Sequence, residues 1–355
     1  MRRDRRIEEL LGIELPIIQA PMAGTVSSRM AIAVSEAGGL GSLPCAMYDE
    51  GRVRAEVSAI RAGTSRPFNL NFFCHARPDA DAAREDAWRR RLAPYYDELG
   101  ADAGAAAGDG GRRPFDAAMC DRVVELRPAV VSFHFGLPDA SLVARVRAAG
   151  AKVLSSATTV EEARWLEDRG CDAIVAQGLE AGGHRGSFLG LDMARQVGTM
   201  ALVPQMVDAV RVPVIASGGI ADARGIVAAF ALGASAVQIG TAYLFTPEAD
   251  ISSAHREALR GVRDEGTVLT NVFTGRPARG LANRFVREAG PMSDLAPPFP
   301  RAASAVAPLR ARAEAKGSVD FSPIWSGQAA RLARAMPAGE LTRRLAEEAR
   351  ALLEG

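Results

Sequence analysis

The sequence has almost no net charge, few cysteines and no long apolar run, and each of these shortages excludes a class of protein. Its 355 residues include 43 Lys and Arg against 42 Asp and Glu, and a net charge of +1 gives no reason to expect nucleic acid as a partner. No apolar run approaches the roughly 20 residues that cross a bilayer, and none follows the basic N-terminus as a signal peptide requires. A membrane protein is therefore not expected.

Cysteine and histidine are both sparse. The four cysteines include no Cys-X-X-Cys pair, which suits a reduced compartment, so we expect a cytoplasmic protein. The four histidines are far apart, and none belongs to a motif with metal-ligand spacing. They are His75, His134, His184 and His255. No metal site is expected, and we interpret His75 and His255 as structural residues.

Short apolar runs that end in proline, glycine or polar residues recur eight times, and nearly all are followed by a helical pattern. They lie at 15–24 (a strand with its loop), 40–43, 67–73, 129–133, 152–156, 173–176, 212–216 and 236–241. Strands that alternate with helices predict a parallel sheet, and eight such units predict a (β/α)8 TIM barrel. The alternative is an open doubly wound sheet, although no Gly-X-Gly-X-X-Gly motif follows the first strand.

A barrel of this kind usually needs about 250 residues, so the surplus predicts insertions. We expect the barrel to comprise 1–245 and about 316–355, with a smaller, mostly helical substrate or lid domain inserted at about 246–315. The helical pattern at 327–353 would complete the barrel. The alanine-rich segment 76–113 reads as an excursion outside the core, with a helix and a flexible link. Its glycine-rich part at 104–111 reads as a length variation away from the site.

The most informative loop follows the predicted strand at 173–176. It contains four glycines, at 178, 182, 183 and 186, and one histidine, His184. Glycine lets a ligand approach the main chain closely, and histidine is the one side chain here that ordinarily titrates near neutrality. In TIM barrels the active site lies at the carboxyl ends of the strands, which is where this loop begins. We therefore predict that His184 lies in the active site.

Other unusual residues follow other predicted strands and should meet at the same barrel mouth. Met22 and His134 follow the first and fourth strands, and Asn71 lies at the end of the third. Gly218-Gly219 and Gly240-Thr241 follow the seventh and eighth strands, whose loops form the common phosphate site of barrel enzymes. A phosphate held there would place its organic group over the barrel mouth. Flavin mononucleotide (FMN) suits this arrangement, and so does a phosphorylated substrate.

An ordered set of motifs gives a sharper expectation. It comprises Gln19-Ala20-Pro21-Met22-Ala23-Gly24, Asn69-Leu70-Asn71-Phe72-Phe73-Cys74-His75, Ser132-Phe133-His134-Phe135-Gly136, Glu180-Ala181-Gly182-Gly183-His184, Ala216-Ser217-Gly218-Gly219-Ile220, Gly275-Arg276-Pro277-Ala278-Arg279-Gly280 and Trp325-Ser326-Gly327-Gln328. With these motifs the chain resembles the nitronate monooxygenases, formerly called 2-nitropropane dioxygenases, and is most similar to their class I. The resemblance implies non-covalent FMN and oxidation of alkyl nitronates, notably propionate 3-nitronate. It implies dioxygen as the oxidant, no NAD(P)H, and a carbonyl compound and nitrite as products.

The resemblance also implies roles for individual residues. His184 would be the active-site histidine, acting on the substrate as a base or as a binding group. His134 would orient the substrate or fix its own loop. The expected FMN contacts are Ala20, Met22, Asn71, Gln177, Gly182, Gly183, Ser217, Gly218, Gly219, Gln238, Ile239, Gly240 and Thr241. The partners would be a small nitronate or nitroalkane and O2, and the enzyme would be a monomer or a homodimer.

Two alternative functions stay open from the sequence. The scaffold also resembles flavin-dependent enoyl-ACP reductases and NAD(P)H:quinone reductases, which need NAD(P)H. A non-redox barrel that binds a sugar phosphate or nucleotide would contain the same phosphate loops.

Overall fold

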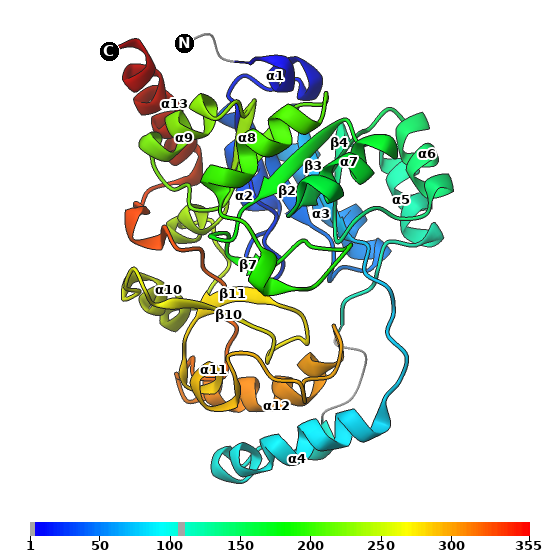
Figure 1. The fold of residues 1–355 in the computed structure, drawn as a ribbon, viewed down its shortest axis with the longest axis vertical. Helices are drawn as coiled ribbons and strands as arrows, with labels where there is room; N and C mark the ends of the chain where they lie inside the picture. Colours follow the sequence, from blue (N-terminus) through cyan, green and yellow to red (C-terminus); the bar gives the residue numbers. More distant parts are fainter. Residues whose placement is uncertain (1–3, 106–110) are drawn as a thin grey trace.

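Eight parallel strands close into a barrel (Figure 1). The computed structural model describes residues 4–105 and 111–355. Its large sheet has the order β1-β9-β8-β6-β5-β4-β3-β2. The strands are β1 (Ile17–Gln19), β2 (Gly41–Pro44), β3 (Phe68–Phe73), β4 (Val130–His134), β5 (Lys152–Ala157), β6 (Ala173–Gln177), β8 (Val214–Ser217) and β9 (Ala236–Ile239). Hydrogen bonds of 2.9 Å between Leu40 and the main chain of β1 join the two edges, so the predicted barrel is confirmed.

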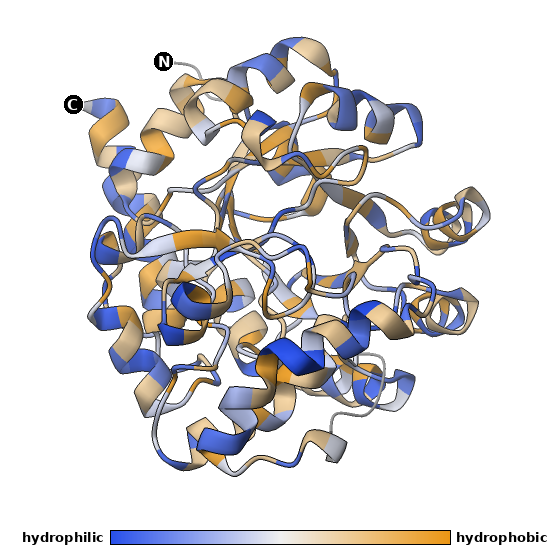
Figure 2. Ribbon diagram, turned by 60° about the horizontal axis from the view of Figure 1, so that its bottom comes forward, coloured by the Kyte–Doolittle hydropathy of each residue, from blue (hydrophilic) through white to orange (hydrophobic). Residues whose placement is uncertain are grey.

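Helices surround the barrel, and each buries one apolar face against the strands. They are α2 (Ser28–Glu36), α3 (Glu50–Gly63), α5 (Ala117–Leu126), α6 (Ala140–Ala148), α7 (Val160–Asp168), α8 (Thr199–Ala209), α9 (Ala223–Ala231) and α13 (Ala338–Glu354). In Figure 2 hydrophilic and hydrophobic stretches alternate along these helices, as expected for helices with one buried side. The C-terminal helix α13 packs on α9 and α2, and completes the ring. None of the described helices combines the length and apolar character required to cross a bilayer.

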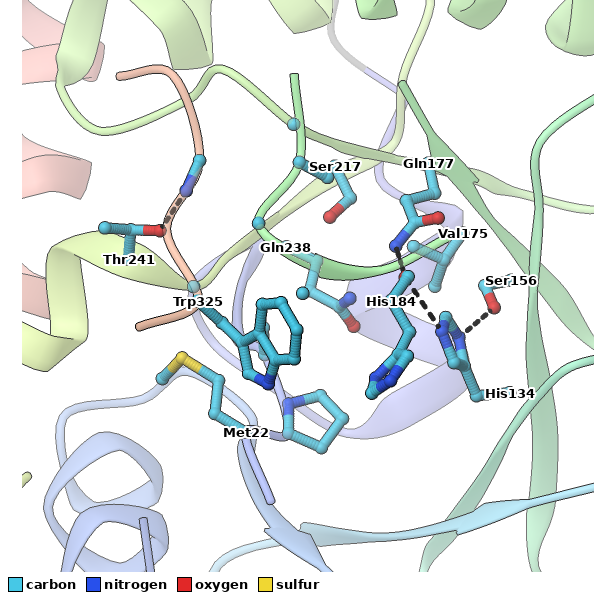
Figure 3. Close-up of a pocket in the computed structure, with 18 of the residues that line it drawn as sticks. Met22, His134, Ser156, Val175, Gln177, His184, Ser217, Gln238, Thr241 and Trp325 are labelled. Atoms are coloured by element: carbon cyan, nitrogen blue, oxygen red, sulfur yellow. Dashed lines mark hydrogen bonds between the residues drawn. The ribbon is translucent and has the colours of Figure 1, made fainter. Parts of the chain in front are cut away.

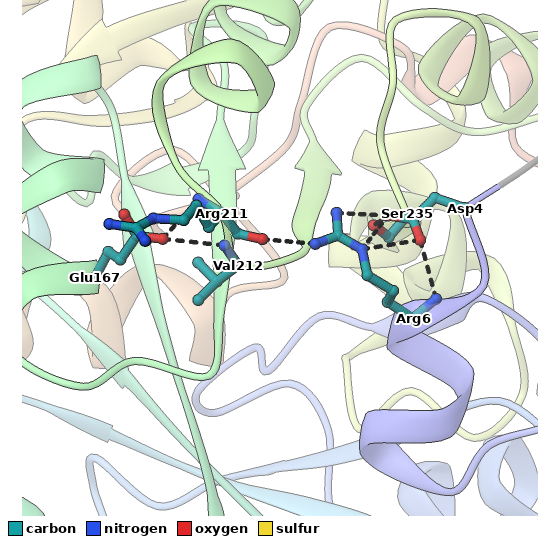
Figure 4. Close-up of polar contacts among 6 residues, drawn as sticks. All are labelled: Asp4, Arg6, Glu167, Arg211, Val212 and Ser235. Carbon is teal, nitrogen blue, oxygen red and sulfur yellow. Dashed lines mark hydrogen bonds and ion pairs between the residues drawn. The ribbon is translucent and has the colours of Figure 1, made fainter.

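The amino-terminal end of the barrel is closed by α1 (Arg6–Leu11), which buries Ile7 and Leu11. Polar contacts tie the start of the chain to the loops that precede β8 and β9 (Figure 4). Arg6 Nη1 donates to the carbonyl of Arg211 at 2.5 Å, and the carboxylate of Asp4 accepts a hydrogen bond from Ser235. On the other side, Glu167 accepts hydrogen bonds from the backbone of Arg211 and Val212. These contacts lie at the end opposite the predicted active site.

A second hydrophobic cluster lies beyond the carboxyl ends of the strands. It involves α4 (Ala82–Leu99), α11 (Arg284–Ala289) and α12 (Ala302–Ala315), which lie together in Figure 1, with α10 (Ser253–Arg260) nearby. The expectation that 76–113 lies outside any core is therefore wrong for α4. Trp88 and Leu92 are buried, and the hydroxyl of Tyr96 donates to the carbonyl of Ala305. The apolar residues of α4 are three and four positions apart, a spacing that predicts a buried helix face.

The insertion also contains a sheet that the sequence did not predict. Strands β10 (Thr267–Thr270) and β11 (Ala278–Leu281) pair antiparallel, and β11 pairs in turn with the two-residue strand β7 (Gly183–His184). The insertion therefore contacts the His184 loop through main-chain hydrogen bonds. The domain boundaries at about 246 and 315 stay a prediction. Short 3-10 helices lie at Ala103–Ala105, Met193–Arg195, Thr241–Phe245 and Ala330–Leu332.

Candidate active site

A deep pocket opens at the carboxyl ends of the strands, where the sequence predicted it (Figure 3). Nearly all of the predicted site residues line it. They are Ala20, Met22, Asn71, His134, Gln177, Gly182, Gly183, His184, Ser217, Gly218, Gly219, Gln238, Gly240 and Thr241. The exception is Ile239, whose side chain packs in the main core, because successive side chains of a strand point to opposite faces and its neighbour Gln238 faces the pocket.

The main chain of the His184 loop is held in place by two side chains from the barrel. The carbonyl of His184 accepts hydrogen bonds from Gln177 Nε2 at 3.0 Å and from His134 Nε2 at 3.2 Å. Gln177 Oε1 accepts a third hydrogen bond, from the backbone N–H of Gly186 at 2.7 Å. Both ends of the Gln177 amide are therefore used by the loop.

A buried arginine reinforces the same loop from below. Arg185 is fully buried, and its guanidinium donates to the carbonyls of Gln177 and Gly178 at 2.7 and 2.6 Å. It also donates to the side chain of Gln196. Burial lowers the pKa of Arg185 to about 10, which leaves it charged at neutral pH. The loop is thus pre-organised by hydrogen bonds that do not depend on a ligand.

The imidazole of His184 lies in an aromatic environment. The ring centroids of Phe299, Trp325 and Phe73 are 5.2, 5.4 and 6.3 Å from its own. Its Nε2 is 2.9 Å from the hydroxyl of Thr274. Burial, followed by the positive charge of Arg112, holds the pKa of His184 well below its ordinary value. His184 is therefore neutral at physiological pH.

His134 has both ring nitrogens engaged. Its Nδ1 is 2.6 Å from Ser156 Oγ, and its Nε2 faces the carbonyl of His184. A carbonyl only accepts, so the proton is on Nε2, and the Ser156 hydroxyl donates to Nδ1. Burial lowers the pKa of His134 to about 3. His134 therefore holds the His184 loop, a role that differs from both roles expected for it, orienting the substrate or fixing its own loop.

The opposite end of the pocket offers main-chain donors. Among the hydrogen bonds of the described residues, none is donated by the backbone N–H groups of Gly218, Gly219 or Gly240. Thr241 Oγ1 accepts from the backbone N–H of Gly327 at 2.9 Å, so its own O–H stays available to donate. A Cβ on Gly182 would lie 2.5 Å from that same Gly327 nitrogen. Free main-chain donors in a narrow turn are what a phosphate group requires.

Several residues that line the pocket were not predicted as ligand contacts, and one of them is His255, which was interpreted as structural. Trp325, which begins the last of the sequence motifs, also lines the pocket beside His184. Arg112, in the segment 76–113 that was expected to lie outside the core, also lines the pocket. Positions 106–110 of that segment are outside the described residues. No local motif distinguishes Arg112 from the many other arginines of the chain, so the sequence held no signal for it.

Comparison with known proteins decides the family. Residues 4–348 match the family model described as Nitronate monooxygenase. The chain belongs to the nitronate monooxygenase family. It is 46% identical over 351 residues to a nitronate monooxygenase of Pseudomonas aeruginosa, which covers 97% of this chain and 99% of that protein. The family expected from the ordered motifs is thereby confirmed.

Solved structures agree with this family assignment. A nitroalkane oxidase from Streptomyces ansochromogenes is 39% identical with a TM-score of 0.88, over 98% of this chain and 99% of that one. FabK from Thermotoga maritima is 29% identical with a TM-score of 0.77, over 100% of this chain and 98% of that one. The nitroalkane oxidase is thus the more similar of these two structures in both sequence and shape. The chain is an enzyme of the nitronate monooxygenase family.

Proposed function

We propose that this enzyme binds FMN and oxidises alkyl nitronates, including propionate 3-nitronate, with dioxygen and without NAD(P)H. The products would be a carbonyl compound and nitrite. The observation that supports this most is that the two ends of the pocket differ in chemistry. Free main-chain donors lie at one end, and a neutral histidine in an aromatic environment lies at the other.

The residues present suit FMN. Gly218, Gly219, Gly240 and Thr241 would hold its phosphate, since they offer main-chain donors and a hydroxyl. Met22, Asn71, Gly182, Gly183 and Gln238 line the same pocket and would contact the flavin ring. When bound, flavin supplies the redox chemistry, taking electrons from the substrate and passing them to dioxygen.

The chain's own residues would position the substrate and control protons. A nitronate is already an anion, so no base is needed, and the neutral His184 imidazole would hydrogen-bond it. With a neutral nitroalkane, the same imidazole would remove the α-proton. Thr274 Oγ1 fixes the ring through Nε2, which leaves Nδ1 for the substrate. Nδ1 would carry the proton when it donates to a nitronate, and Nε2 would carry it when Nδ1 acts as the base. Phe73, Phe299 and Trp325 would exclude water around the reacting group.

The test is spectroscopic. Gently purified protein should be yellow, and the flavin released by denaturation should be FMN. Under anaerobic conditions propionate 3-nitronate should bleach the bound flavin rapidly, and NADH should not. Rapid bleaching by NADH together with no response to nitronates would instead support the NAD(P)H-dependent reductases. A colourless protein would support the non-redox alternative. Cytoplasmic location and a monomeric or homodimeric state stay predictions.

A further inference from the structure

We propose that Ser132 donates a hydrogen bond to a ring carbonyl of bound FMN and, together with the side-chain oxygen of Asn71, recognises the imide edge of the flavin. The inference rests on the FMN binding that the proposed function includes, and it does not depend on the turnover of any substrate. It adds a residue to the cofactor site, because Ser132 is not among the FMN contacts expected from the sequence.

The hydroxyl of Ser132 has both of its acceptor positions filled. Its Oγ accepts from Asn69 Nδ2 at 2.8 Å and from Asn71 Nδ2 at 2.9 Å. A hydroxyl has two lone pairs and one proton, so the proton of Ser132 points away from both amides. Among the hydrogen bonds of the described residues, none is donated by this hydroxyl. Ser132 is 7% exposed and lines the pocket, so a ligand in the pocket is the partner available to this donor.

The orientation of the Asn71 amide is fixed by a main-chain carbonyl. Asn71 Nδ2 also lies 3.3 Å from the carbonyl oxygen of Ser132, which can only accept. The nitrogen therefore faces Ser132, and Asn71 Oδ1 faces away from it. Within the described part of the chain Oδ1 accepts no hydrogen bond, and Asn71 lines the pocket. Because the two residues are opposite each other on β3 and β4, a free acceptor and a free donor lie side by side in the pocket wall.

An adjacent donor and acceptor select the kind of ligand. The imide edge of a flavin presents an N–H group flanked by two carbonyls, which complements an acceptor beside a donor. A nitronate presents acceptor oxygens there, and one of them would be placed against Asn71 Oδ1. Ser132 also precedes His134 by two residues on β4, so it lies deeper in the barrel than the ring that contacts the His184 loop. Position and chemistry therefore both favour the flavin over the substrate.

Two other serines provide matched controls. Ser155 also lines the pocket, but its Oγ donates to the main-chain carbonyls of Phe133 and Gly136 at 3.2 and 2.9 Å. Ser42 Oγ accepts from Asn69 Nδ2 at 3.1 Å, but Ser42 does not line the pocket. Ser155→Ala therefore removes a pocket hydroxyl whose proton is already committed. Ser42→Ala removes an amide partner outside the pocket.

The test measures the bound flavin in the holoenzyme. A hydrogen bond lowers the stretching frequency of the carbonyl that accepts it, so one infrared carbonyl band of FMN should move to higher frequency in Ser132→Ala. The affinity for FMN, measured from the flavin released on dilution, should fall roughly 3- to 10-fold, as expected for one neutral hydrogen bond. Ser132→Thr keeps the hydroxyl and should keep the band position. Ser155→Ala and Ser42→Ala should change neither the band nor the affinity.

The outcomes separate this inference from the rest of the proposed function, because neither readout needs turnover. A shifted band and weaker FMN binding in Ser132→Ala alone would support the inference, even if no nitronate were oxidised. If the carbonyl bands of Ser132→Ala stayed in place, or if Ser42→Ala weakened FMN binding as much, the inference would be wrong. The Ser132 proton would then be taken by Asn69, with that amide turned round. A protein that binds no FMN would contradict both proposals.

Discussion

Replacing Gln177 by Glu changes one hydrogen bond at the His184 loop and keeps the other. The introduced carboxyl can still accept from the backbone of Gly186, as Oε1 does now at 2.7 Å. It loses the Nε2 donor that is 3.0 Å from the carbonyl of His184, and it places one oxygen against another. Gln177 is only 7% exposed, so water cannot easily compensate for the loss.

The expected cost of Gln177→Glu follows from this geometry. Leaving a buried group unsatisfied destabilises a protein by about 1–3 kcal/mol. With an unfolding entropy of about 2.1 cal/mol/K per residue, a chain of this length should lose roughly 1–4 °C in Tm. Protonation of the introduced carboxyl would restore a donor, so its pKa in the folded state should be raised. The stability that depends on this proton is present at low pH and lost as pH rises. The difference in Tm between Gln177→Glu and the unaltered protein should therefore be larger at pH 8 than at pH 5.

The assay is thermal melting at both pH values, with Gln205→Glu as the matched control. Gln205 is exposed and donates to the carbonyl of Ala201 on its own helix, so its replacement should change stability by less than about 0.5 kcal/mol. If Gln177→Glu melted like the unaltered protein at both pH values, the loop would not depend on the Gln177 amide.

Two further predictions concern the glycine turn and the buried histidines. Gly182→Ala should destabilise the protein by roughly 1–3 kcal/mol and lower its flavin content, because the new Cβ would lie 2.5 Å from the Gly327 nitrogen. Gly190→Ala, where no atom lies within 4 Å, should change neither, and equal effects would refute the clash. Because the pKa of His134 is lowered to about 3, the unfolded chain binds this proton more readily below pH 6.5. His134 should therefore destabilise the folded state by about 2 kcal/mol at pH 5 relative to pH 8, as urea titration can measure, and equal stability would contradict its neutral state.

Local patterns were enough to predict the barrel and most of its mouth. Each strand appears as a short apolar run, and the chemistry of a parallel barrel collects at one end of its strands. Gln238 faces the pocket and Ile239 packs in the core, because successive side chains of a strand point to opposite faces. This rule can be applied to the sequence alone. Strand alternation therefore indicates that the Ile239 side chain does not face the pocket, and the predicted FMN contact of Ile239 stays a prediction.

The features that sequence reasoning missed depend on contacts between distant segments. The guanidinium of Arg112 lines the pocket and lies near the ring of Phe299, a residue that is distant from Arg112 in the sequence. Strand β7 exists because β11 pairs with it, and neither segment has a strand pattern of its own. Helix α4 differs, because the spacing of its apolar residues did indicate a buried face and only its partner, α12, could not be predicted. Such pairings are set by the tertiary fold and leave little trace in local periodicity.

Oxygen consumption tests the central claim most directly. The FMN-loaded enzyme should consume dioxygen rapidly when propionate 3-nitronate is added without NAD(P)H, and His184→Ala should be much slower. A larger loss with neutral nitroalkanes than with nitronates would indicate that His184 acts as a base, and equal losses would indicate a binding role. No oxygen uptake with any nitronate, in protein shown to contain FMN, would contradict the proposed function.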